Sequence, residues 1–320
     1  MQDKEYFIEK GEKEREISNF YKAIDYYKKA RELGKSIEAE IGIAHCMRVT
    51  GNFKNALNLY ENILKKYKKN EIIADALLGK ALCLKGLSKT KSAIFYLKKA
   101  EKIYENINDE IGLANLYWAY AVVLRVAGDF LNALKYGEKA LSMFNYYNDK
   151  KGILYAKCAL GGLNRILGNL NDSFEYYNSA NEIAKKIKDK FGTAYSFCGI
   201  GNYYRMRDDF SKAMEFFKKA EEIYKKIKDI VSFSYTLWSL GILMTKKGEF
   251  EKAEGCFEMS MENFKKTKDQ RGIVYCLIGL IQLKHLKKED YTLELENCKE
   301  ILSKFELKWE RLLFEILQSK

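Results

Sequence analysis

Hydrophobic and polar positions recur along this chain with a long period. A short polar or glycine-containing turn signal ends in an aromatic or apolar residue, and a small residue follows three positions later. The recurring positions after the turn are Phe20, Phe53, Thr90, Phe130, Leu170, Phe210 and Phe250. They are 33, 37, 40, 40, 40 and 40 residues apart. A fixed period of this length predicts an array of structural repeats.

A second polar position has the same period. Aspartate stands before an apolar run in five successive units, at Asp109, Asp149, Asp189, Asp229 and Asp269. Because an aspartate carboxylate accepts the unpaired backbone N–H groups of a helix start, each aspartate predicts the beginning of a helix. Each unit is therefore interpreted as helix A, a turn and helix B. In one unit the pattern predicts helix A over about 189–207 and helix B over about 210–227.

The residues within one unit resemble the tetratricopeptide repeat. The pattern is Leu160-Gly161, Gly168, Ser173, Tyr177 and Ala180. The unit is longer than usual and is similar to the subgroup found in kinesin light chains, LGN-type polarity adaptors and bacterial Rap regulators. This resemblance covers about residues 5–288 and implies an all-α fold, a right-handed superhelical solenoid of antiparallel helix pairs. Such pairs bury their apolar faces only against neighbouring repeats.

The expected organisation is an array of about seven repeats over residues 1–288 and capping helices over 289–320. Fifteen or sixteen helices and no β-sheet are predicted. The C-terminal segment carries an amphipathic stripe consisting of Phe305, Trp309, Leu312, Leu313 and Ile316. This stripe favours a helix that covers the open end of the solenoid. Docking of a partner on the same helix is the alternative.

Composition favours a cytoplasmic helical protein without a membrane segment. The chain has no proline, which favours helices joined by short turns. Its apolar stretches are shorter than the roughly 20 residues of a membrane span, and the N-terminus lacks the order of a signal peptide. The seven cysteines form no Cys-x-x-Cys pair, so they are expected to be buried free thiols.

Net charge and residue types argue against several functions but do not identify one. The net charge is +12, which permits acidic partners including nucleic acid. Lysine pairs such as Lys98-Lys99 and Lys218-Lys219 are expected on the outer side of helix B. The two histidines, His45 and His285, are far apart, and no metal-ligand spacing or phosphate loop is present. We therefore expect neither an enzyme nor a cofactor.

The resemblance implies that ligands bind in a concave groove lined by helix A. Two residue types repeat in the inward phases: arginine, with its rigid fork of donors, and tyrosine, with a flat face and a polar end. The candidate ligand-binding residues are Arg48, Arg125, Arg165, Arg205, Asn115, Asn202, Gln282, Trp118, Trp238, Tyr155, Tyr195, Tyr235 and Tyr275. As alternatives, cations near the end of helix A complement the helix dipole, and the aromatic residues pack between repeats.

These observations favour a scaffold or adaptor that binds another protein, through an extended acidic peptide or an acidic surface. One alternative is a helical-repeat protein that binds RNA or single-stranded nucleic acid, since arginine with stacking aromatics suits both ligands. A second alternative is a sensor of a peptide signal. The sequence does not name the partner.

Overall fold

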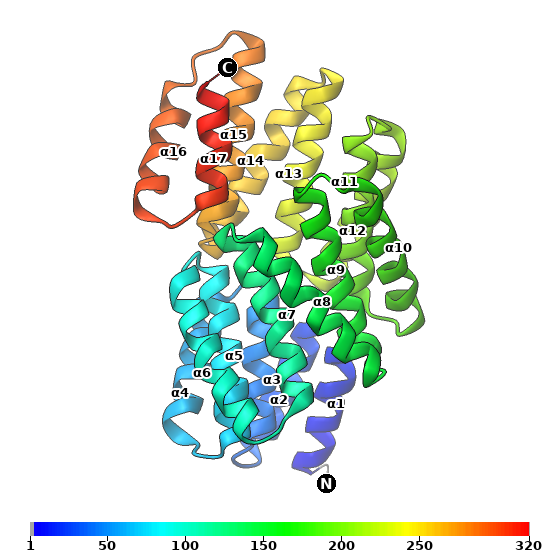
Figure 1. The fold of residues 1–320 in the computed structure, drawn as a ribbon, viewed down its shortest axis with the longest axis vertical. Helices are drawn as coiled ribbons and strands as arrows, with labels where there is room; N and C mark the ends of the chain where they lie inside the picture. Colours follow the sequence, from blue (N-terminus) through cyan, green and yellow to red (C-terminus); the bar gives the residue numbers. More distant parts are fainter. Residues whose placement is uncertain (1–2, 320) are drawn as a thin grey trace.

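The computed structural model describes residues 3–319, in which seventeen α-helices and no β-strand occur. The helices are α1 (Lys4–Glu16), α2 (Phe20–Glu32), α3 (Ile37–Val49), α4 (Phe53–Lys66), α5 (Asn70–Gly86), α6 (Thr90–Asn106), α7 (Glu110–Ala127), α8 (Phe130–Tyr146), α9 (Lys150–Ile166), α10 (Leu170–Lys186), α11 (Lys190–Met206), α12 (Phe210–Ile227), α13 (Ile230–Lys247), α14 (Phe250–Thr267), α15 (Gln270–Lys287), α16 (Thr292–Lys304) and α17 (Lys308–Gln318). Each helix from α1 to α15 packs against the next, α17 packs back against α15, and the array forms a solenoid with the two termini at opposite ends of its long axis (Figure 1).

The predicted all-helical solenoid is confirmed, but the predicted number of helices is too small. The seven repeat signals account for α1 to α14. The remaining chain forms three helices rather than one or two, because α16 follows α15 as a further helix B. Its sequence signal is lost, since Leu293 replaces the small residue that marks helix B in the other units.

The aspartate caps start five A helices, as predicted. In each case the carboxylate accepts the backbone N–H three residues later, over 2.8–3.1 Å. The helices of the example unit, α11 and α12, begin and end within a residue of the predicted bounds. The sequence period therefore sets the helix starts through one recurring hydrogen bond.

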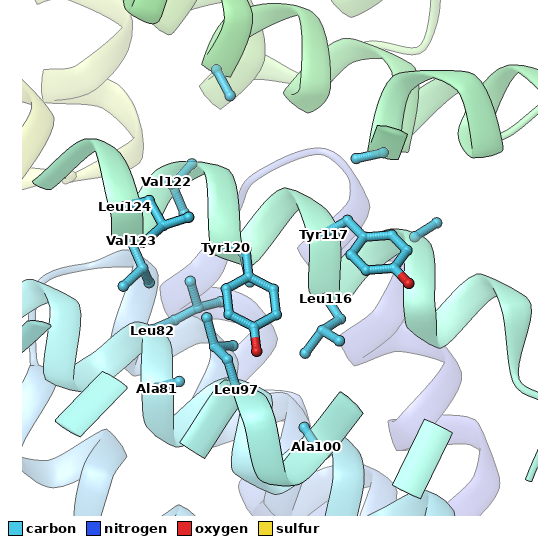
Figure 2. Close-up of a cluster of buried hydrophobic side chains, with 14 of the residues drawn as sticks. Ala81, Leu82, Leu97, Ala100, Leu116, Tyr117, Tyr120, Val122, Val123 and Leu124 are labelled. Carbon is cyan, nitrogen blue, oxygen red and sulfur yellow. The ribbon is translucent and has the colours of Figure 1, made fainter. Parts of the chain in front are cut away.

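The core lies between successive helices. The small residues that follow each turn signal are completely buried, namely Ala23, Ala56, Ala93, Ala133, Ser173, Ala213 and Ala253. They allow helix B to approach helix A closely, and larger side chains fill the space on either side. Figure 2 shows this packing across α5, α6 and α7, where Leu82, Leu97 and Leu116 surround the ring of Tyr120.

Glycines near the starts of the A helices make room for aromatic rings. A Cβ added to Gly272 would lie 2.5 Å from the ring of Phe264 on the preceding helix, whereas one added to Gly255 would meet nothing within 4 Å. Gly272→Ala is therefore expected to destabilise the protein by about 1–3 kcal/mol through overpacking. Gly255→Ala, on exposed α14, should stabilise it by up to about 1 kcal/mol through helix propensity. Urea unfolding of both variants tests this pair, and equal effects would contradict it.

Turns of the superhelix that are distant in sequence touch one another. Ser18, in the turn between α1 and α2, donates its hydroxyl to Asp189 at the start of α11 (2.8 Å). Gly51, between α3 and α4, lies against the side chains of Val231 and Thr267. Phe130, at the start of α8, packs edge-to-face on Trp309 of α17, with ring centroids 5.1 Å apart. These contacts hold together parts of the superhelix that are distant in sequence.

The C-terminal helix is part of this closure. The helix α17 packs against both α15 and α7, and its Glu310 is 1% exposed. Leu312 and Ile316, from the same amphipathic stripe, are exposed. The helix therefore packs between α15 and α7 and leaves Leu312 and Ile316 on the outside.

None of the helices within residues 3–319 combines the length and hydropathy needed to cross a membrane. The seven cysteines are free, and five of them are buried while Cys198 and Cys256 are partly exposed. Burial raises the pKa of the Cys46 and Cys83 thiols to about 12, which keeps them protonated and unreactive.

Candidate functional site

The last turn of helix A carries a basic residue in five successive repeats. These are Arg48 on α3, Lys85 on α5, Arg125 on α7, Arg165 on α9 and Arg205 on α11. Four of the side chains are half-buried and Arg205 is buried. The sequence analysis identified the four arginines. Lys85 stands at the same point of the period, 40 residues before Arg125.

Lys85 shows that cations from different repeats come together. Burial, and then the charges of Arg271, Arg125 and Arg48, lower the pKa of its ammonium group to about 7, opposed in part by Asp269. These residues belong to α3, α5, α7 and α15, so cations from four helices act on one ammonium group. A lysine that is partly neutral near pH 7 requires an environment that disfavours added positive charge.

The inward cations lack ion-pair partners. Of the salt bridges formed within residues 3–319, none involves Arg48, Lys85, Arg125, Arg165, Arg205 or Arg271. The Nε atoms of Arg48 and Arg125 are buried, and their N–H groups donate to no acceptor within the same range. Buried charged groups are normally paired, so this surface is suited to receive negative charge.

Gly162 makes room for one of these guanidinium groups. A Cβ at Gly162 would lie 2.5 Å from Nη1 of Arg125 and 3.1 Å from the hydroxyl of Tyr177. The phenol of Tyr195 also lies beside Arg125. Arg125 on α7 therefore reaches the surfaces of α9 and α11, between two tyrosine hydroxyls.

Arg205 is held by Asn202, one turn earlier on α11. Its Nε and Nη2 atoms donate to the side-chain carbonyl of Asn202 at 3.2 and 3.1 Å, and the Asn202 amide donates to the carbonyl of Cys198 at 2.9 Å. Burial, and then the charge of Arg165, lower the pKa of Arg205 to about 10. Asn202 is one of the candidate ligand-binding residues. In this structure its carbonyl is occupied in orienting Arg205.

Two of the four predicted tyrosines connect neighbouring repeats. The hydroxyl of Tyr155 donates to Asp189 at 2.6 Å, and that of Tyr235 donates to Asp269 at 2.9 Å. In both pairs a helix A is joined to the aspartate cap of the next helix A, 34 residues further on. Their rings line the inner surface while their hydroxyl groups stabilise the stacking of repeats.

The other two tyrosines deviate from this arrangement. Tyr195 lies beside Arg125 instead of pairing with Asp229. One carboxylate oxygen of Asp229 is consequently buried without a partner, and burial raises the pKa of this residue to about 6. Tyr275 lies beside Glu310 of α17. These two phenols are therefore free to interact with groups other than an aspartate cap.

The remaining predicted residues have simpler environments. The indole of Trp118 donates to the backbone carbonyl of Tyr155 at 3.2 Å, and that of Trp238 donates to the carbonyl of Tyr275 at 3.0 Å. Asn115 is exposed and its amide bonds to its own helix, and Gln282 is exposed near the end of α15. The tryptophans therefore join successive A helices. The side chains of Asn115 and Gln282 form no hydrogen bond with the inward cations among residues 3–319.

Arg271 is an inward cation that the sequence analysis missed. Its Nε donates to the hydroxyl of Tyr235 at 3.1 Å, and its guanidinium lies 5.1 and 5.8 Å from the ring centroids of Tyr235 and Tyr275. It stands two residues after the cap Asp269, as Lys151 stands two residues after Asp149. The inward phases taken from the resemblance begin one turn later, so both residues were passed over.

Comparison with known proteins agrees with this architecture. Residues 152–226 match the model of a tetratricopeptide repeat family. A comparison with curated proteins gives no match. A structure of a Rap protein complexed with competence and sporulation factor is similar, with 14% identity, 99% of this chain and 97% of that chain covered, and a TM-score of 0.67.

Two further structures share the fold. One is NprR in complex with its cognate peptide NprX, with 17% identity, 84% and 78% of the two chains covered, and a TM-score of 0.65. The other is a signal transduction ATPase with a tetratricopeptide repeat sensor from Pyrococcus horikoshii, with 22% identity, 96% of this chain covered and a TM-score of 0.55. This chain spans 48% of that ATPase.

The fold and the inner surface define a helical-repeat solenoid of stacked helix pairs. Its helix pairs stack as in tetratricopeptide-repeat proteins, and residues 152–226 match that family's model.

Proposed function

We propose that this protein is a receptor for a peptide signal, which binds in extended form along the inner surface of the solenoid through acidic groups. The observation that carries the proposal is the set of inward cations without ion-pair partners. An extended chain covers the roughly 10 Å between packed helices in about three residues. Spaced carboxylates on one peptide can therefore reach arginines on successive repeats.

Closure of the superhelix favours a peptide over an acidic protein surface. The contacts of Ser18 with Asp189 and of Phe130 with Trp309 hold successive turns together. A folded domain cannot enter between turns that touch, and an extended segment, about 5 Å across, is the narrower ligand. The two similar structures of a Rap protein and of NprR were both solved as complexes, the second with its cognate peptide. This similarity supports a peptide sensor over a general adaptor.

Nucleic acid is a less suitable ligand for the outer surface. Lys98, Lys99, Lys218 and Lys219 are exposed on helix B, as expected. Some of them pair with neighbouring side chains, since Lys219 bonds Glu215 and Lys99 lies over the ring of Phe95. A solvated outer face explains these lysines without a polynucleotide.

The test uses a fluorescein-labelled ten-residue peptide of alternating glutamate and phenylalanine, and the same peptide with lysine for glutamate. Fluorescence anisotropy should show binding of the acidic peptide only. Arg125→Ala, Arg165→Ala and Arg205→Ala should each weaken it by about ten- to a hundredfold, because each removes a charge-assisted contact. Arg→Lys should restore binding only in part.

Arg207→Ala is the matched control, since Arg207 is exposed at the end of α11 and should leave the affinity unchanged. If the acidic and basic peptides bind alike, or the three inward variants behave as this control, the proposal is wrong. Bound polynucleotide that high salt removes, seen as a fall in the 260/280 nm absorbance ratio, would favour nucleic acid instead.

A further inference from the structure

Lys85 and the three arginines whose charges act on it form one group of cations from different repeats. This four-cation cluster consists of Arg48, Lys85, Arg125 and Arg271. Its members come from α3, α5, α7 and α15, so the first half of the array and its last A helix contribute to one place. Arg165 and Arg205 form a separate pair further along, in which each lies within the field of the other.

Within residues 3–319, only two acidic groups are identified next to the cluster, and one of them already accepts hydrogen bonds. Asp269 accepts from the backbone of Gly272 and from the hydroxyl of Tyr235. Glu310 lies beside Arg271 and Tyr275, and its Oε2 atom is buried without a hydrogen-bond partner. Burial raises the pKa of Glu310, which weakens it as a fixed counter-charge. Two such carboxylates do not compensate four cations.

We propose that the four-cation cluster is a binding site for one phosphate group, carried either by a phosphorylated residue of the bound peptide or by a separate small molecule. The proposal deepens the receptor function above, because it names the chemistry of one part of the ligand. A phosphate carries about two negative charges at neutral pH and offers oxygens to several donors at once. A single carboxylate carries one charge and bridges fewer donors, so it leaves most of the cluster uncompensated.

The unpartnered donors of the cluster suit this group. Nε of Arg48 and Nε of Arg125 are both buried and unbonded, and arginine forks recognise phosphate oxygens. Lys85 contributes a compact charge between them. Because Lys85 is faced by Arg48, Arg125, Arg271 and Asp269, a bound anion is the change that would allow its ammonium group to keep a proton above pH 7.

Binding should therefore be linked to proton uptake. In the free protein Lys85 has a pKa of about 7, and a phosphate in contact raises it towards the ordinary value near 10.4. Between these values the complex holds more protons than the free protein. Phosphate affinity should fall as pH rises from 7 to 9, by up to about tenfold per pH unit for one proton.

The experiment is calorimetric titration of the full chain with pyrophosphate and with inorganic phosphate, in buffers of different ionisation enthalpy at pH 8. We expect binding with uptake of up to one proton. Lys85→Met should abolish the uptake, and Lys85→Met, Arg125→Met and Arg271→Gln should each weaken binding by about ten- to a hundredfold. Arg207→Met is the control and should match the wild type. Glu310→Gln should tighten binding, since it removes negative charge beside Arg271.

Two sets of peptides separate the sources of the phosphate. If a peptide that carries one phosphoserine binds more tightly than its glutamate counterpart and pyrophosphate displaces it, the phosphate belongs to the peptide. If pyrophosphate and the glutamate peptide bind together, it belongs to a separate molecule.

No binding of either phosphate compound at millimolar concentration, or equal binding by the cluster variants and Arg207→Met, would overturn the phosphate site. The receptor function would then be tested only by the binding of the acidic peptide. Phosphate binding without any peptide binding would instead reject the receptor function and keep the site.

Discussion

Asp189→Ala is expected to lower the free energy of unfolding by about 2–5 kcal/mol, more than any other loss of a helix cap in the array. Its carboxylate is 1% exposed and has three partners. It accepts from the backbone N–H of Gly192 at 2.9 Å, from Ser18 at 2.8 Å and from Tyr155 at 2.6 Å. The substitution removes the cap and leaves two hydroxyl groups without their acceptor in the interior.

These losses add to about 2.5–8 kcal/mol, and the expected loss lies in the lower part of that sum because neighbouring contributions are not fully additive. A lost N-cap costs about 0.5–2 kcal/mol, and each polar group left unsatisfied in a buried place costs about 1–3 kcal/mol. Ser18 also accepts the backbone N–H of Phe191 at 3.0 Å, so its position affects the start of α11 twice. Because Ser18 belongs to the first repeat, the substitution also weakens the contact between superhelical turns.

Asp149 supplies the matched control. It caps α9 through the backbone of Lys151 and Gly152, at 3.0 and 2.9 Å, and it is partly exposed. Asp149→Ala should therefore cost only the cap, about 0.5–2 kcal/mol. Urea unfolding followed by circular dichroism measures both variants. Equal losses would show that the hydroxyl groups of Ser18 and Tyr155 find other partners and that the contact between turns contributes little.

Much of the fold follows from local chemistry that the sequence displays directly. An aspartate, a glycine three residues on and a buried small residue after each turn recur with a fixed period, so helix starts and packing faces are visible without a structure. Even the third unit, which has no aspartate cap, keeps this period. The helix α5 begins after Lys69, which stands 40 residues before Asp109 and lacks a side-chain cap. Counting back from Arg125 by the same number gives Lys85.

The closure of the superhelix could not be predicted in this way. Ser18 and Asp189 are 171 residues apart, and their contact depends on small rotations between repeats that add up over a whole turn. The same holds for Glu310, whose place near Arg271 depends on where α17 lies at the end of the array. A periodic sequence determines neighbours along the chain, whereas the site combines residues from different superhelical turns.

The roles of the predicted residues divide for a similar reason. The four arginines lie on the inner surface because their phase on helix A is fixed. The hydroxyl groups of Tyr155 and Tyr235 donate to the aspartate that caps the next helix A. Tyr195 lies beside Arg125 instead, although Asp229 stands at the equivalent distance in sequence. Residues at the same point of the repeat therefore share a position on helix A but not a hydrogen-bond partner. A side chain that already has such a partner is not available to a ligand.

Lys85→Met is expected to make the protein more stable at pH 7, and this advantage should shrink as the pH rises. In the folded protein Lys85 has a pKa of about 7 because burial and then Arg271, Arg125 and Arg48 disfavour its charge. An unfolded lysine has a pKa near 10.4. Between these values the unfolded state binds more protons than the folded state, so the stability of the wild type rises with pH.

The difference in unfolding free energy between the wild type and Lys85→Met isolates the contribution of Lys85. Buried thiols such as Cys46 and Cys83 have raised pKa values and make stability fall over the same range, but they are common to both chains. From pH 7 to 9 the advantage of Lys85→Met should decrease by up to about 1.4 kcal/mol per pH unit. Urea unfolding at pH 7, 8 and 9 measures it, with Lys98→Met on the exposed face of α6 as control. A difference independent of pH would mean that solvent keeps Lys85 charged and that the four cations do not repel one another, which would also remove the reason for an anion to bind among them.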